Sequence, residues 1–223
     1  MRVYHLSEAQ FALSNVALRR IKISRFSDLN DPFELLGADL NNKEHRRAFR
    51  LSKEEIDQNK GLLCFSSSWD NPVLWSHYAE KHRGVCLGFD VPDHLLVPVI
   101  YTDKPMKIDT GGKSSLPKLS ESFVNALLRT KYVDWRYEDE YRVFLQLDHK
   151  AAECGLYFYS FSSALVLREV ILGPRCELPI KGIRELVANF DPQVYVIKSR
   201  LAFTRFKVVE NKVVTRQKRA ARI

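Results

Sequence analysis

Charged and aromatic side chains suited to catalysis are densest in the segment 135–142, which reads Trp-Arg-Tyr-Glu-Asp-Glu-Tyr-Arg. Alternate side chains of an extended chain share a face, so we expect Glu138, Glu140 and Arg142 to point together, away from a core face that begins at Tyr141. Two carboxylates beside a guanidinium can hold a proton, orient a nucleophile or stabilise positive charge. The alternative is an exposed strand edge with a simple Glu–Arg pair, which contributes little stability.

Two other segments concentrate polar groups. The segment 30–34, Asn-Asp-Pro-Phe-Glu, has the residue types of a turn, and Glu34 adds a carboxylate that a turn does not need. The segment 75–78, Trp-Ser-His-Tyr, gathers aromatic and polar groups on one helical turn. The alternative there is that Trp75 and Tyr78 are core residues at i, i+3 and that His77 is exposed.

The spacing does not support several other kinds of site. A phosphate loop ending in 111–114 would need glycine at position 107, where Lys107 stands. His77 and His82 are five residues apart, which is not the i, i+4 spacing of a helical metal pair. Cys64 lies in an apolar strand-like run, where a thiol is usually inert. With four cysteines and no CxxC pair, we expect no metal and free thiols in a reducing compartment.

Helices and strands must bring these segments together. Period-2 patterns and apolar runs predict strands at 2–5, 20–24, 62–66, 85–90, 141–147, 165–172, 195–198 and 206–209. Helical spacing predicts helices at 8–18 with Ser7 as cap, 41–59, 72–81 with Asn71 as cap, 119–128 and 180–190. The irregular order predicts an α+β single domain over residues 1–211, with mixed, mostly antiparallel sheets and flanking helices.

Charge is concentrated at the end of the chain. Lys and Arg total 35 against 27 Asp and Glu, a net charge of +8, and residues 212–223 hold five basic residues and no acid. We expect this basic tail to be a solvated terminus, with nucleic-acid binding as the alternative. Aromatic residues among the basic ones would favour nucleic acid, and the tail has none. With no apolar run of membrane length and no signal peptide at the start, we expect a soluble, cytoplasmic protein without membrane partners.

In this order, the segments 30–34, 64–66, 75–90 and 135–142 resemble the domain-of-unknown-function 2971 family. The likeness runs from Val3 to about Gly173. The motifs are specific only in combination, and the family name implies no activity.

A second resemblance does imply an activity. Tyr4-His5 on a first strand, followed by a helix, a strand and a turn, is similar to the opening of the His-type ADP-ribosyltransferases. That resemblance implies NAD as co-substrate, with His5 at the ribose or nicotinamide amide, Glu140 as the catalytic acid and Glu138 beside it. The superfamily also has a middle motif with a Ser or Tyr that lines the nicotinamide pocket. Ser66, Ser67 and Tyr78 are all candidates for that residue here. Cleavage of the nicotinamide–ribose bond passes through an oxocarbenium-like centre, which a carboxylate stabilises.

The same resemblance implies a wider NAD-binding set. Aromatic rings, including Trp135, would stack on the nicotinamide or adenine, and an arginine would hold the pyrophosphate. The implied cofactor-binding residues are Tyr4, Arg25, Asn30, Asp31, Ser66, Ser67, Trp75, His77, Tyr78 and Arg142.

The favoured interpretation is an ADP-ribosyltransferase-like enzyme that acts as a toxin or an effector of bacterial antiviral defence. One alternative is a non-catalytic nucleotide or nucleic-acid binding module that uses the same pocket and the basic tail. Another is a metal-independent nuclease or hydrolase with Glu138, Glu140 and His77. His5 and Glu140 stand far apart in the sequence, so a separation above about 15 Å in the fold would exclude a shared NAD site.

Overall fold

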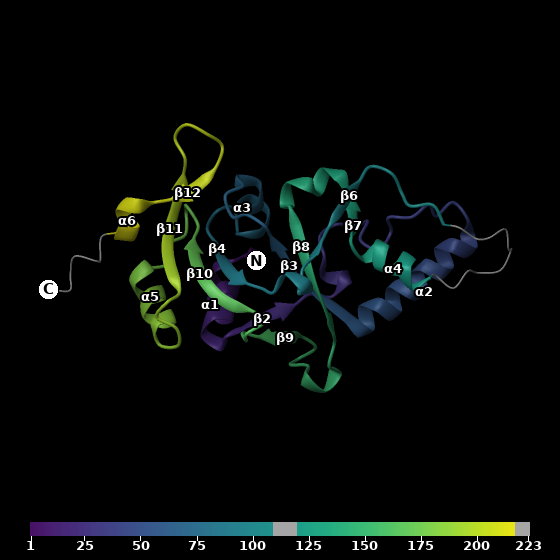
Figure 1. The fold of residues 1–223 in the computed structure, drawn as a ribbon, viewed down its shortest axis with the longest axis horizontal. Helices are drawn as coiled ribbons and strands as arrows, with labels where there is room; N and C mark the ends of the chain where they lie inside the picture. Colours follow the sequence, from purple (N-terminus) through teal and green to yellow (C-terminus); the bar gives the residue numbers. More distant parts are fainter. Residues whose placement is uncertain (109–119, 217–223) are drawn as a thin grey trace.

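An eight-stranded sheet runs through the protein, in the order β12-β11-β10-β4-β1-β3-β8-β5 (Figure 1). The computed structural model describes residues 1–108 and 120–216. Within this sheet only β10 and β11 pair in parallel. Its strands are β1 (Arg2–Ser7), β3 (Lys60–Ser66), β4 (Val85–Asp90), β5 (Val97–Pro98), β8 (Glu140–Gln146), β10 (Val166–Leu172), β11 (Tyr195–Leu201) and β12 (Val208–Glu210).

Two short strand pairs and the helices surround this sheet. The strands β2 (Arg20–Ile23) and β9 (Tyr157–Ser160) pair antiparallel, and β6 (Ile100–Thr102) and β7 (Thr130–Tyr132) pair in parallel. A 3₁₀ helix spans Val133–Glu138. The α-helices are α1 (Ala9–Leu18), α2 (Lys43–Asn59), α3 (Pro72–Tyr78), α4 (Glu121–Leu128), α5 (Ile180–Ala188) and α6 (Lys212–Arg216).

The middle strands of the sheet are covered on both faces. On one face, α1 and α5 pack against β4 and β10 through residues such as Val16 and Ile183. On the other, α3 packs Trp75 against Cys86 and Ile171. A strand covered on both sides reads as a continuous apolar run, as β4 does.

The sheet is weakly joined at one place. β1 pairs with β4 along six positions, and β3 pairs with β8 along seven. Between β1 and β3, however, only Tyr4 and Ser66 are in register. Further along, β3 is bridged instead to Ser24, just after β2. The two halves of the sheet therefore diverge beyond Tyr4, and we call this junction the seam.

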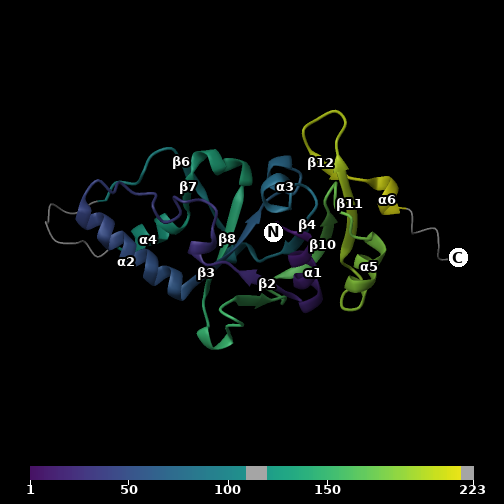
Figure 2. The same ribbon diagram turned by 180° about the vertical axis from the view of Figure 1, so that it is seen from behind.

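A second, smaller core lies at one end of the molecule. Phe49 of α2, Leu127 of α4 and Leu62 of β3 are buried together there. In the front and back views, α2 and α4 lie at the opposite end from α5 and α6 (Figures 1 and 2). The fold class is as predicted: an α+β single domain with a mixed, mostly antiparallel sheet.

Most predicted elements are present, with some corrections. Asn71 caps α3 through its side-chain oxygen, 2.9 Å from the amide of Val73. Ser7 does not cap α1, because it is still paired within β1 and Glu8 occupies the cap position. The short strands β5, β6, β7 and β9 were not predicted, because two to four residues are too few for a clear period-2 pattern.

Two expectations concern segments at the edge of what the structure describes. The loop 111–114 lies outside the described residues. The predicted tail begins with α6, which packs against β11, and residues 217–223 lie outside the described part. Within the described ranges, no helix combines the length and apolar character needed to cross a membrane.

Candidate functional site

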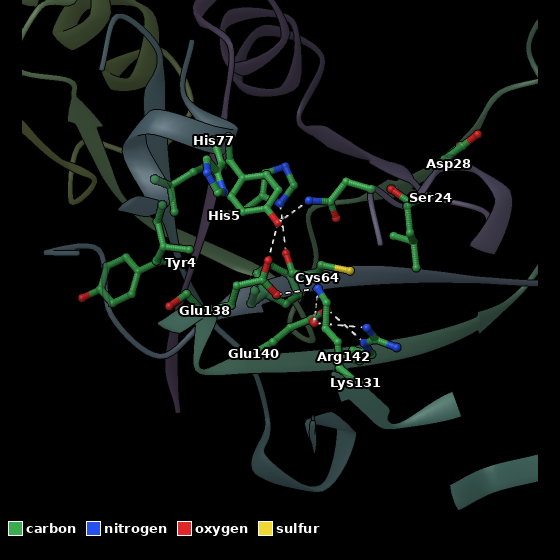
Figure 3. A pocket seen from close by; sticks show the side chains of 17 residues that line it. Tyr4, His5, Ser24, Asp28, Cys64, His77, Lys131, Glu138, Glu140 and Arg142 are labelled. Carbon is green, nitrogen blue, oxygen red and sulfur yellow. Dashed lines mark hydrogen bonds and ion pairs between the residues drawn. The ribbon is translucent and has the colours of Figure 1, made fainter. Parts of the chain in front are cut away.

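A cavity of about 380 Å³ opens beside the seam, between α3, β3 and β8 (Figure 3). It lies within the size range of small-molecule sites and joins an apolar wall to several polar groups. Its lining residues are Tyr4, His5, Leu6, Ser24, Asp28, Leu29, Asn30, Cys64, Phe65, Ser66, Leu74, His77, Tyr78, Lys131, Glu138, Glu140 and Arg142.

His5 lies at the seam, where β1 and β3 separate. Its Nδ1 is 3.1 Å from the carbonyl oxygen of Cys64. A carbonyl only accepts, so Nδ1 carries the proton and Nε2 of the neutral ring is an acceptor. Burial lowers the pKa of His5, which keeps the ring neutral at neutral pH.

Beneath the cavity lies a buried ion cluster of Glu34, Lys131, Glu138, Glu140 and Arg142. Arg142 is fully buried, and its Nε and Nη2 donate to the two carboxylate oxygens of Glu140 at 2.9 and 3.1 Å. Its Nη1 and Nη2 donate to Glu34, the former at 3.1 Å. Nη1 also reaches the carbonyl oxygen of Leu128 at 2.9 Å. Arg142 is thus held by two carboxylates at the centre of the site.

Lys131 is the second cation of the buried ion cluster. Its Nζ donates to Glu138 at 2.5 Å and to Glu140 at 3.4 Å, and it lies 4.8 Å from the ring centre of Trp135. Burial alone would lower the pKa of Lys131, but the two carboxylates outweigh it and raise the pKa. Lys131 is therefore charged at neutral pH.

The two neighbouring carboxylates differ in their surroundings. Burial raises the pKa of Glu138, although Lys131 acts in the opposite direction. Burial also opposes ionisation of Glu140, but Arg142 and Lys131 outweigh it and lower the pKa of that carboxyl group. Glu140 is thus a stable anion between two cations, while Glu138 binds a proton more readily than Glu140 does.

Glu138 also connects the buried ion cluster to the cavity wall. The hydroxyl group of Tyr78 donates to Glu138, and Asn30 donates to that hydroxyl oxygen at 2.8 Å. On the same helix, His77 Nδ1 lies 2.8 Å from the hydroxyl group of Tyr137. The polar groups of segments 30–34, 75–78 and 135–142 therefore meet in one site.

The backbone around Glu138 differs from the extended chain that the sequence suggested. Glu138 ends a 3₁₀ helix and Asp139 adopts a left-handed conformation, with φ of 44°. The Ser67 amide donates to the Asp139 carbonyl at 3.1 Å, and the two side chains also bond. Glu138 and Glu140 thus converge on Lys131 from two elements, and the turn aims both carboxylates inward. The interpretation as an exposed Glu–Arg pair is wrong, because both partners are buried.

The structure brings most of the predicted site residues to the cavity and leaves four outside it. Trp75 is buried in the core, where its indole N–H donates to the carbonyl of Trp69, so no ligand can stack on it. Ser67 bonds Asp139, and Arg25 lies outside the lining near Asp57. The predicted residues that do line it are Tyr4, His5, Asn30, Ser66, His77, Tyr78, Glu138, Glu140 and Arg142.

Asp31 is the fourth of these residues and has a supporting role. It is buried, and its Oδ1 accepts from the Phe33 amide at 2.9 Å while its carbonyl accepts from the Glu34 amide at 3.1 Å. This is the turn chemistry that the segment predicted, and it presents Glu34 to Arg142. Lys131 was missed altogether, because a lone lysine on a three-residue strand has no distinguishing pattern.

Comparisons with known proteins match parts of the chain. Protein arginine N-methyltransferase 7 of Drosophila sechellia is 30% identical over 129 residues, which cover 48% of this chain and 19% of that protein. The chain thus spans about a fifth of that relative's length. No solved structure matches, and the likeness to ADP-ribosyltransferases stays a prediction.

A family model matches the part of the chain that carries much of the site. The model described as a protein of unknown function, DUF2971, matches residues 74–143. That stretch contains most of α3, all of β4 and the start of β8, with Tyr78, Lys131, Glu138 and Glu140 of the cavity. The resemblance to the domain-of-unknown-function 2971 family is therefore confirmed over residues 74–143.

Proposed function

We propose that the protein binds NAD with its nicotinamide and the adjoining ribose in the cavity, and that it cleaves the bond between the nicotinamide and that ribose. The observation that carries the proposal is the meeting of His5, Glu138 and Glu140 in one cavity of about 380 Å³. This volume is at the lower end of the range for ligand sites. The cavity therefore suits one half of a dinucleotide, and the adenosine half would lie outside it.

The charge of the site suits this substrate. The buried ion cluster has three carboxylates and two cations, so its net charge is −1 when every member is ionised. The nicotinamide ring of NAD carries a positive charge until its bond to ribose breaks. As that bond breaks, the charge moves to the ribose, where a nearby carboxylate stabilises the oxocarbenium-like transition state.

Glu138 is the better candidate for that carboxylate. Its two oxygens each accept one hydrogen bond, from Tyr78 and from Lys131, which leaves lone pairs for a ribose hydroxyl group. Glu140 accepts three bonds from two cations, so we assign it the role of fixing Arg142 and Lys131. His5, neutral and with Nε2 as an acceptor, would bind an amide or hydroxyl donor of the nicotinamide riboside.

The bonds balance without a further reagent. The N-glycosidic bond breaks, nicotinamide leaves as a neutral molecule with the bonding electrons, and the ribose carbon bonds to water or to another nucleophile, which loses a proton. With water as the acceptor, the reaction is NAD hydrolysis. Unrestrained hydrolysis depletes NAD, which would suit a toxin or an antiviral effector.

The test is nicotinamide release from NAD by the purified protein, measured by chromatography, with Glu138→Gln beside the wild type. We expect the variant to lose about a hundredfold or more in rate, as when one catalytic acid–base or transition-state contact is removed. The matched control is Glu153→Gln, an exposed carboxylate paired with Arg20 away from the cavity, which should keep full activity.

Two results would contradict the proposal. Equal rates for Glu138→Gln and wild type would remove Glu138 from the reaction. No release by the wild type, together with no shift of its melting temperature by NAD, would exclude NAD as the ligand. A melting-temperature shift without release would instead identify a non-catalytic nucleotide-binding pocket.

A further inference from the structure

The loop between β11 and β12 exposes two aromatic side chains almost completely. We call residues 201–207 the hairpin tip; it projects from the sheet beside α3 (Figures 1 and 2). Phe203 is 90% exposed and Phe206 is 99% exposed. Two large apolar side chains this exposed on one short loop are typical of an interaction surface.

Basic side chains accompany these rings. The guanidinium of Arg200 lies 4.5 Å from the centre of the Phe203 ring. Arg205 is exposed and lies near enough to Asp70 to help lower the pKa of that carboxyl group. Lys207 is paired with Asp70 at the base of the tip. The surface thus combines two exposed rings with one guanidinium that stacks on a ring and a second that is exposed to solvent.

The hairpin tip is held in place by its backbone. The Ala202 amide donates to the Lys207 carbonyl at 2.9 Å, and the Val208 amide donates to the Asp70 carbonyl at 2.8 Å. Ala202 and Lys207 thus close the loop, and the rings project from a braced hairpin. A loop whose base is fixed loses less backbone entropy when it binds a partner.

We propose that the hairpin tip binds single-stranded nucleic acid. Unpaired bases stack on exposed aromatic rings and on guanidinium planes, and phosphates bind the neighbouring cations. Basic residues interleaved with aromatic ones, the pattern absent from the basic tail, are present here in the sequence Arg-Leu-Ala-Phe-Thr-Arg-Phe-Lys of residues 200–207. The net charge of +8 adds a general attraction for a polyanion. This inference does not depend on NAD cleavage.

The experiment measures binding of fluorescein-labelled oligouridine and oligothymidine of 12 nucleotides by anisotropy. We expect Phe203→Ala and Phe206→Ala each to weaken binding by at least about fivefold, the lower limit for loss of one base-stacking contact. Arg205→Gln should weaken binding and reduce the slope of log affinity against log salt by about 0.7. The three side chains are exposed, so the variants should fold as the wild type does.

The matched control is Phe11→Ala, which removes an exposed phenylalanine from α1 and should leave affinity unchanged. A duplex of the same length should bind more weakly than the single strand, because its bases are not free to stack. Replacing the basic residues of the tail 212–223 by serine tests the tail, and loss of binding only there would overturn the proposal. It would also be overturned if the protein bound anionic phospholipid vesicles through Phe203 and Phe206 and bound neither oligonucleotide.

Discussion

Two ion clusters adjoin the eight-stranded sheet and differ mainly in their exposure to solvent. In the buried ion cluster, the side chains of Arg142 and Glu34 are 0% and 1% exposed. On the strands β1, β4 and β10, a second set of charged residues forms what we call the exposed ion cluster: Arg2, Asp90, Arg168 and Glu169. Its side chains are 24–41% exposed. Both clusters contain Arg–carboxylate bonds of about 2.7–3.1 Å.

Solvent exposure determines which of these charges the stability of the fold depends on. Removing one partner from a buried pair leaves an uncompensated charge in a low-dielectric interior, whereas water and salt screen an exposed one. The exposed ion cluster can therefore vary with little cost. Burying the charges of the buried ion cluster costs desolvation free energy. The cluster adjoins a cavity, and charge arrangements of this kind are typical of functional sites.

The largest effect should come from Arg142→Met. This change leaves Glu34 and Glu140 without their main counter-ion, and we expect it to lower the free energy of unfolding by about 3–5 kcal/mol. The measurement is urea denaturation followed by circular dichroism. The matched control is Arg168→Met in the exposed ion cluster, where we expect about 1 kcal/mol or less. Similar losses for the two variants would contradict the contrast between the clusters.

A smaller loss is expected for Glu140→Gln. The neutral amide weakens three hydrogen bonds from Arg142 and Lys131. A hydrogen bond to a charged group contributes about 1.5–3 kcal/mol to stability. We therefore expect Glu140→Gln to lower the free energy of unfolding by about 1.5–3 kcal/mol. Glu169→Gln in the exposed ion cluster should lower it by less than about 1 kcal/mol. An unchanged stability of Glu140→Gln would show that its carboxylate is not needed to hold the two cations.

The smallest effect is expected for Asp90→Asn, and it depends on pH. Hydrogen bonds from Arg2 and Arg168 lower the pKa of Asp90 in the folded protein. Its contribution to stability is therefore present above the unfolded-state pKa of about 4 and is lost as pH falls through the lower folded-state pKa. At pH 7 we expect a loss of at most about 1 kcal/mol. Urea denaturation of both proteins between pH 7 and pH 3 checks this, and a pH-independent difference would count against it.

The sequence predicted helices α1 to α5 and the long strands, because local periodicity or capping residues mark each of them, but it did not predict α6. Helix α3, for instance, follows from its Asn71 cap and Pro72. It also located the three polar segments that meet at the cavity. It could not reveal Lys131, nor the left-handed turn at Asp139 that makes Glu138 and Glu140 converge, because both depend on contacts between distant segments.

The seam determines where the large sheet opens locally with the least disruption. The junction of β1 and β3 has one paired position, fewer than any other junction between adjacent strands of the large sheet. Local opening needs the least backbone disruption there, so hydrogen exchange should reach the amides beside the seam sooner than those in the middle of β4. The cavity adjoins this junction, so a small separation of the two half-sheets would enlarge it while the core on either side stays folded.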